Sequence, residues 1–105
     1  MKIVAVSACP SGLMHTYMAA ESLKKAAMKR GYDIKVETHG AIGKEDILKK
    51  EDIEQSDVVI IMADIHVDTS RFLGKKIISV STAYGIRHTF ELLDKIGGLH
   101  DESVL

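Results

Sequence analysis

The 105-residue sequence has one cysteine, one proline and no tryptophan. One cysteine cannot form an internal disulfide, and a free thiol is typical of a reducing compartment. The charges nearly cancel, with 14 Lys and Arg against 15 Asp and Glu, and the scattered basic residues form no stripe for nucleic acid. The apolar run near the start is too short for a signal peptide or a membrane span. We therefore expect a cytoplasmic protein that neither binds nucleic acid nor inserts into the membrane.

Apolar runs alternate with helical patterns along the chain, and no repeat interrupts them. The apolar runs predict strands at residues 2–7, 33–38, 58–63 and 76–81. The helical patterns lie at residues 13–30, 50–55, 69–73 (one turn) and 82–96, the last ending at Gly97 and Gly98. This rhythm predicts an α/β fold with a single doubly wound, Rossmann-like sheet of four parallel strands flanked by helices. At this length we expect one domain over residues 1–105.

Cys9 stands where the first predicted strand gives way to the first predicted helix. In a doubly wound sheet, ligands bind beyond the carboxyl ends of the strands, where the winding reverses. A helix N-terminus there offers unpaired N–H groups and the positive end of the helix dipole, which favour an anion and a thiolate. We therefore predict that Cys9 is a nucleophile of lowered pKa in a phosphate site; the alternative is a buried core cysteine.

Several phosphate-binding motifs can be tested against this loop. The glycine patterns of dinucleotide sites and Walker A loops are absent, and no acidic pair follows the first strand as a receiver domain needs. The serious competitor is the C-x5-R-[ST] loop of low-molecular-weight tyrosine phosphatases and arsenate reductases, but His15 and Thr16 stand at the last two positions. Histidine cannot make the bidentate guanidinium clamp on phosphate. The loop therefore suits carrying a phosphoryl group; a phosphatase, and a redox or binding module, remain as alternatives.

The segment CPSGLMHTYMAA at residues 9–20 resembles the loop of the fructose-type EIIB components of the bacterial phosphoenolpyruvate:sugar phosphotransferase system (PTS), roughly C-P-[TS]-G-x-A-H-T-Y-M-A-A. Two further blocks agree, VETHG at residues 36–40 and ADIHVD at 63–68, the latter followed by Arg71 and Phe72. The resemblance covers about residues 2–96. It implies that Cys9 accepts a phosphoryl group from a phosphohistidine on the EIIA protein and donates it to a fructose-like sugar bound by the membrane EIIC transporter. No cofactor or metal is predicted.

The predicted phosphate loop contains polar groups whose roles the sequence leaves open. We favour a phosphate contact for His15 over a capping role, while Ser11 and Thr16 suit both roles equally. Asp64 and Asp68 are expected to be loop and cap residues. Besides Cys9, the predicted phosphate-binding residues are Pro10, Ser11, Gly12, Leu13, Met14, His15 and Thr16.

Two methionines are predicted to lie on the exposed face of the first helix. At about 100° per residue, Met14 and Met18 fall among charged residues rather than on the apolar face. They are either tolerated surface residues, or covered by the helix after the fourth strand, or a docking patch. Soft methionine side chains suit a surface that binds more than one partner.

Overall fold

The computed structural model describes residues 1–104, with side chains described as far as residue 97. The strands are β1 (Lys2–Ala8), β2 (Asp33–Gly40), β3 (Gly43–Glu45), β4 (Val58–Ala63) and β5 (Ile77–Val80). The helices are α1 (Met14–Lys29), α2 (Lys50–Gln55), the 3-10 helix η1 (Ser70–Phe72), α3 (Thr82–Arg87) and α4 (Thr89–Val104). None of these helices is long and apolar enough to cross a membrane.

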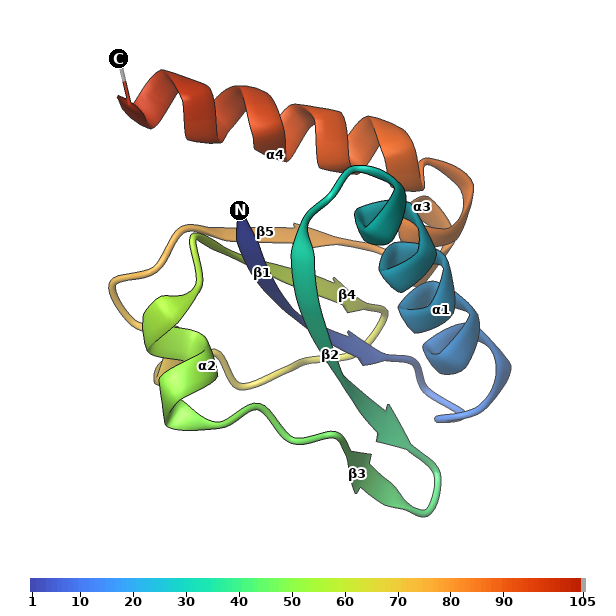
Figure 1. The fold of residues 1–105 in the computed structure, drawn as a ribbon. Helices are drawn as coiled ribbons and strands as arrows, with labels where there is room; N and C mark the ends of the chain where they lie inside the picture. Colours follow the sequence, from blue (N-terminus) through green and yellow to red (C-terminus); the bar gives the residue numbers. More distant parts are fainter. Residues whose placement is uncertain (105) are drawn as a thin grey trace.

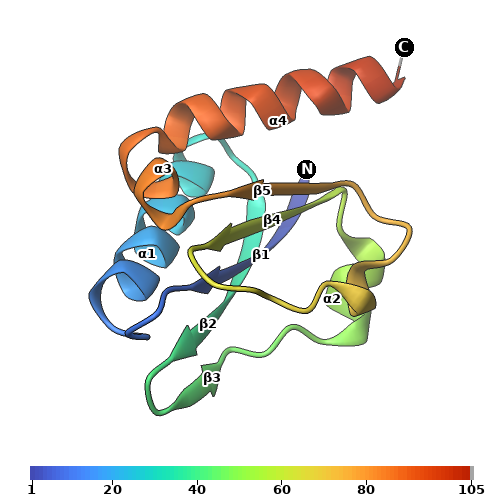
Figure 2. The same cartoon turned by 180° about the vertical axis from the view of Figure 1, so that it is seen from behind.

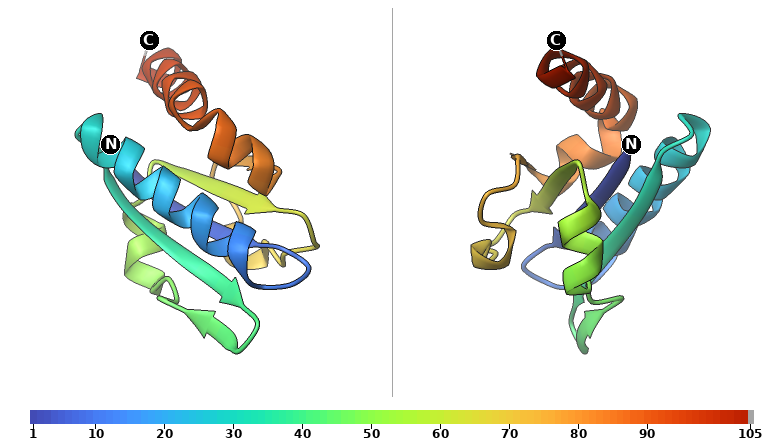
Figure 3. Two further views of the ribbon diagram at one scale, coloured as in Figure 1. Left: turned by 90° about the vertical axis from the view of Figure 1, so that its right-hand side faces the viewer. Right: turned by 60° about the vertical axis from the view of Figure 1, so that its left-hand side comes forward.

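The strands form one sheet in the order β3-β2-β1-β4-β5 (Figure 1). β1 is central and pairs in parallel with β2 and β4, and β5 continues the parallel sheet beyond β4. The predicted α/β class with four parallel strands is confirmed. Figures 2 and 3 show helices α1, α3 and α4 over one face of the sheet and α2 with η1 over the other.

Alternating side chains of the central strands supply a core on each face of the sheet. Ile3 and Ala5 pack toward α1 and α4, whereas Val4 and Val6 pack toward Ile53 of α2 and Phe72 of η1. β4 is apolar at every position because both of its sides are covered, as in other central parallel strands. The two cores hold β1 rigidly, and β1 leads directly into the cysteine loop.

Two boundaries predicted from sequence were wrong. The strand expected at residues 33–38 runs on to Gly40, and beyond a turn at Ala41 and Ile42 the unpredicted strand β3 pairs antiparallel to β2 as a hairpin. The expected last helix breaks at His88 and continues to Val104 rather than ending at Gly97 and Gly98. At the break, the Thr89 hydroxyl donates to the carbonyls of Gly85 and Ile86, and such back-bonding bends helices.

The register of the strands brings three loops together at the carboxyl edge of the sheet. Ala8, the last residue of β1, lies between His39 of β2 and Ala63 of β4. The Asp64 backbone N–H then donates to the Ala8 carbonyl at 3.0 Å. Cys9, which follows Ala8, therefore lies at the carboxyl end of the central strand, between the segments that follow β2 and β4.

Candidate functional site

Cys9 follows β1 directly and begins a tight turn. The Gly12 N–H donates to the Cys9 carbonyl at 3.1 Å, and Gly12 adopts a φ of 65°, a left-handed conformation that glycine accepts without strain. The thiol side chain is folded into the loop, so that the residue is only 3% exposed. Two hydroxyls reach the sulfur: Thr16 Oγ1 donates to Sγ at 3.0 Å, and Ser11 Oγ lies 3.5 Å from it.

The Cys9 thiol ionises readily in this setting. Burial opposes ionisation, but hydrogen bonds from the Ser11 and Thr16 side chains and from the Leu13 and Thr16 backbone N–H groups outweigh it and lower the pKa of Cys9 to about 6. Hydrogen bonds to the charged form of a group stabilise that form. At neutral pH the sulfur is therefore mostly thiolate, which is the nucleophilic form.

Ser11 and Thr16 act on the sulfur and not as helix caps. Leu13 is the N-cap residue of α1, and no side chain caps this helix end. Thr16 is fully buried, and its own carbonyl accepts a hydrogen bond from the Ser7 hydroxyl at 2.7 Å. This bond from β1 fixes the first turn of α1 against the sheet and keeps the Thr16 hydroxyl aimed at the sulfur.

The remaining residues of the predicted loop differ in exposure. Gly12 is buried, whereas Pro10, His15 and the apolar side chains of Leu13 and Met14 are exposed. Within residues 1–97, His15 makes no hydrogen bond or ion pair, so its imidazole is open to solvent beside the loop. The structure does not test its predicted phosphate contact.

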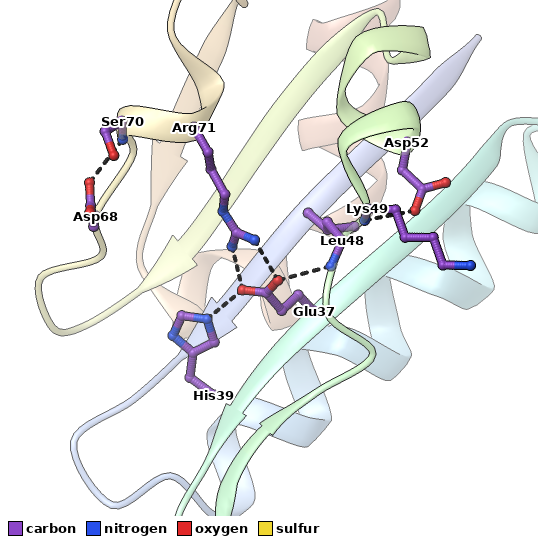
Figure 4. Close-up of polar contacts among 8 residues, drawn as sticks. All are labelled: Glu37, His39, Leu48, Lys49, Asp52, Asp68, Ser70 and Arg71. Atoms are coloured by element: carbon purple, nitrogen blue, oxygen red, sulfur yellow. Dashed lines mark hydrogen bonds and ion pairs between the residues drawn. The ribbon is translucent and has the colours of Figure 1, made fainter.

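Asp64 and Asp68 are loop and cap residues, as predicted. Asp64 accepts hydrogen bonds from the backbone N–H and the hydroxyl of Thr82, at 3.0 and 2.5 Å, at the start of α3. These bonds, with a smaller contribution from the charge of nearby His15, lower the pKa of Asp64. Asp68 accepts from the backbone N–H of Ser70 at 2.9 Å at the start of η1 (Figure 4).

Sequence reasoning missed a buried carboxylate next to the site. Glu37 of β2 is fully buried, and the Arg71 guanidinium of η1 donates to both of its oxygens (Figure 4). The Leu48 N–H and the His39 ring complete the shell, at 3.0 and 2.7 Å. Burial opposes ionisation, but these bonds, led by that of Arg71, lower the pKa of Glu37 to about 2. A glutamate in a strand covered on both faces was the signal that could have revealed it.

His39 belongs to this carboxylate cluster. His39 pairs with Ala8 in the register, yet its ring turns toward Glu37, while Thr38 is buried. In residues 1–97 no group of three or more histidine, cysteine or acidic side chains is arranged to hold a metal ion.

Comparison with known proteins gives consistent matches. Residues 4–95 match the family described as "PTS system, Lactose/Cellobiose specific IIB subunit". The chain is 46% identical over 96 residues to the "PTS system fructose-like EIIB component 2" of Escherichia coli strain K12, covering 90% of this chain and 91% of that protein. It is 44% identical to the "PTS system fructose-specific EIIB'BC component" of Rhodobacter capsulatus over 90% of its own length, but it spans only 16% of that relative.

Solved structures agree on the fold. A domain of the fructose-specific IIABC component of Borrelia burgdorferi superposes with a TM-score of 0.87 at 46% identity, covering 90% of each chain. The solution structure of an Enzyme IIB subunit of the PTS from Escherichia coli K12 gives a TM-score of 0.91 at 30% identity, covering 99% of this chain and 97% of that one. Sequence and structure therefore point to one family.

Proposed function

Because the chain belongs to the EIIB family of the sugar phosphotransferase systems, we propose that it is a phosphoryl carrier of a fructose-type system with Cys9 as its phosphorylated residue. Cys9 accepts the phosphoryl group from a phosphohistidine on the EIIA protein and donates it to a fructose-like sugar bound by the membrane EIIC transporter. The protein thus acts as a phosphotransferase in the cytoplasm, as a single EIIB unit over residues 1–105, with no cofactor.

The observation that carries this proposal is the kind of anion site around Cys9. The sulfur is held as a thiolate by hydroxyls and N–H groups, and Arg71, the arginine that follows the ADIHVD block, is committed to Glu37. Donors of this kind stabilise the thiolate and can bind phosphoryl oxygens. Without a guanidinium clamp, the loop gives little help to water attacking the phosphorus.

The transfer consists of two displacements at phosphorus. The Cys9 thiolate attacks in line, the S–P bond forms, the N–P bond breaks, and the electron pair returns to the donor imidazole. In the second displacement, a sugar hydroxyl attacks the phosphocysteine and passes its proton to the surrounding water, the O–P bond forms, and the S–P bond breaks. The sulfur leaves as a thiolate, for which a low thiol pKa is favourable.

Intact mass of the chain provides the test. Incubation with phosphoenolpyruvate, the general PTS proteins and EIIA should add the mass of one phosphoryl group to the wild type and nothing to Cys9→Ser. Iodine should release the group, as expected for a phosphorus–sulfur bond. Phosphate on His15 or His39, or a bond stable to iodine, would contradict the proposal. Rapid hydrolysis of a generic aryl phosphate at neutral pH would favour the phosphatase alternative.

We also propose that Met14 and Met18 belong to the surface that the phosphohistidine donor covers. Their side chains are 69% and 45% exposed, on the first turns of α1 next to the loop. The donor histidine must come in line with a sulfur that is almost buried, so its protein covers these turns. Because EIIA must leave before EIIC can reach the same phosphocysteine, we expect a small interface of about 1,200 Å² or less.

Charge substitution at the two methionines tests this docking surface. Met14→Glu combined with Met18→Glu should slow transfer from EIIA, while alkylation of Cys9 by a small reagent keeps its wild-type rate. Met28→Glu is the matched control, because Met28 is 75% exposed at the far end of the same helix. Unchanged transfer in the double variant would show that the two side chains are ordinary surface.

A further inference from the structure

The β2–β3 hairpin touches the cysteine loop through the backbone. The Ala41 N–H, in the turn of the hairpin, donates to the Gly12 carbonyl at 2.8 Å. The approach is so close that a Cβ on Gly12 would lie 2.5 Å from the Ala41 nitrogen. Glycine at this position is therefore required by the hairpin as well as by its φ of 65°.

This contact fixes the orientation of one peptide plane. In a planar trans peptide the carbonyl and the following N–H point in opposite directions. The Gly12 carbonyl points outward to the hairpin, so the Leu13 N–H of the same plane points inward. It donates to the Ser11 hydroxyl oxygen at 3.3 Å, and that oxygen lies 3.5 Å from the Cys9 sulfur. Because the Ser11 oxygen accepts from the Leu13 N–H, its own hydrogen is left to donate to the sulfur. Gly12 has no Cβ to hinder rotation of the plane, so an outside contact is needed to hold it.

A second contact holds the hairpin against α1. The Tyr17 hydroxyl donates to Glu45 Oε1 of β3 at 2.9 Å. A Cβ on Gly40 would lie 2.2 Å from that hydroxyl oxygen, so the Tyr17 ring rests directly on the β2 backbone. The hairpin is thus attached to the first turns of α1 at one point and to the cysteine loop at another.

We propose that the β2–β3 hairpin is a positioning element for the site: the Ala41 N–H, by holding the Gly12 carbonyl, aims the Leu13 N–H at the Ser11 hydroxyl oxygen, and this bond orients the Ser11 hydroxyl toward the Cys9 sulfur. In the free protein this hydroxyl stabilises the thiolate. After transfer it faces the phosphoryl group on the same sulfur, and this second part rests on the proposed function. Ala41 is therefore a positioning residue that acts through a peptide plane, and its side chain takes no part.

Ala41→Pro tests the proposal because proline removes the N–H and leaves the chain continuous. Ala41 has no positive φ, and Gly40 before it is extended in β2, as a residue preceding proline prefers. The thiol pKa is read from the pH dependence of alkylation by iodoacetamide. We expect it to rise by about half a unit, so that alkylation at pH 5 slows about threefold. Ala41→Ser keeps the N–H and should restore the wild-type pH profile.

A second route reaches the same peptide plane without proline. Gly12→Ala should push the hairpin away, because the new methyl would lie 2.5 Å from the Ala41 nitrogen and 2.8 Å from the Gly40 carbonyl carbon, both backbone atoms, and the thiol pKa should rise. A folded Ala41→Pro protein with an unchanged thiol pKa overturns the proposal. If Ala41→Pro does not fold, an unchanged pKa in Gly12→Ala overturns it.

These measurements separate the inference from the proposed function. Alkylation requires no partner protein, so a raised thiol pKa in Ala41→Pro supports the positioning role even if Cys9 never takes a phosphoryl group. Conversely, phosphorylation of Cys9 together with an unchanged pKa in Ala41→Pro supports the carrier function and rejects the role of the hairpin.

Discussion

Two anions lie on neighbouring strands at the carboxyl edge of the sheet, and the protein stabilises them differently. The Glu37 carboxylate is fully buried and receives both arms of the Arg71 guanidinium. The Cys9 thiolate is stabilised by hydroxyl and N–H dipoles. Glu37 is thus neutralised by the positive charge of Arg71, whereas the groups that donate hydrogen bonds to Cys9 are uncharged.

This difference separates a structural anion from a reactive one. The Glu37–Arg71 pair links β2 to η1, and its charges are already neutralised, so it offers nothing to an incoming phosphoryl group. The donors around Cys9 can shift from the thiolate to phosphoryl oxygens without breaking an ion pair. An arginine at the cysteine would bind a phosphoryl group more strongly and also promote its hydrolysis, which would oppose the proposed carrier function.

The largest effect is expected from breaking the structural pair. Glu37→Gln removes the counter-charge of Arg71, whose side chain is 34% exposed. Solvent at Arg71 should keep the loss in the free energy of unfolding below the value of about 3–5 kcal/mol that is typical of a fully buried pair, but above that of an exposed pair. Urea denaturation provides the measurement. The thiol pKa of Cys9 should remain near 6, because Glu37 makes no contact with the sulfur.

An exposed ion pair serves as the control for this loss. Arg30→Ala removes a pair with Asp94 in which both side chains are substantially exposed, and such pairs contribute about 0–1 kcal/mol. A Glu37→Gln protein no less stable than Arg30→Ala would show that the buried cluster is not a structural requirement.

The second prediction introduces an arginine into the cysteine loop. The wild type should hydrolyse an aryl phosphate only negligibly, whereas His15→Arg creates the phosphatase spacing and should raise hydrolysis by up to about 10²–10³-fold, the usual value of one transition-state donor. Release of p-nitrophenol measures the rate. His15→Lys is the control, because it adds a charge without the bidentate fork. Equal rates in the two variants would mean that charge alone limits hydrolysis.

The third prediction uses pH to distinguish the two anions. Both groups have a lowered pKa in the folded protein, so each stabilises the fold above its folded pKa. The Glu37 contribution should be lost as the pH falls from 4.5 to about 2, and that of Cys9 as it falls from 9.0 to about 6. The slope for each group is at most about 1.4 kcal/mol per pH unit.

The free energy of unfolding of the wild type and of matched variants, measured as a function of pH, separates the two pH ranges. The stability difference between the wild type and Cys9→Ala should grow between pH 6 and 9, and that between the wild type and Glu37→Gln should shrink below pH 4.5. A Cys9→Ala difference that stays constant from pH 6 to 9 would mean that the thiol pKa is not lowered.

The smallest expected effect comes from a single hydroxyl. Thr16→Val keeps the shape of the side chain but removes the donor 3.0 Å from the sulfur, so the thiol pKa should rise by about one unit, a tenfold change in thiolate at low pH. Ser11→Ala should have a smaller effect, because its oxygen lies 3.5 Å away and the side chain is exposed. A larger effect of Ser11→Ala would reverse this assignment.

Much of the site could be read from the sequence because its parts are contiguous. Cys9, Ser11, Gly12 and Thr16 lie in one strand end, turn and helix start, so the local chain path brings the Ser11 and Thr16 hydroxyls near the sulfur. The exposure of Met14 and Met18 likewise follows from helical periodicity. The choice between cap and sulfur contact for Ser11 and Thr16 was open in the sequence, because both roles require the same residue types at the same positions.

The alternation of strand and helix patterns by itself determined the α/β class, the four parallel strands and the place of Cys9 at their carboxyl edge. Only the tertiary structure decided which distant groups meet there. The Glu37–Arg71 pair spans 34 residues, and the Ala41 bond to Gly12 depends on β3 folding back onto β2. Periodicity reports the face on which a residue lies, whereas contacts between elements depend on how strands are ordered and on how a short hairpin packs against a helix.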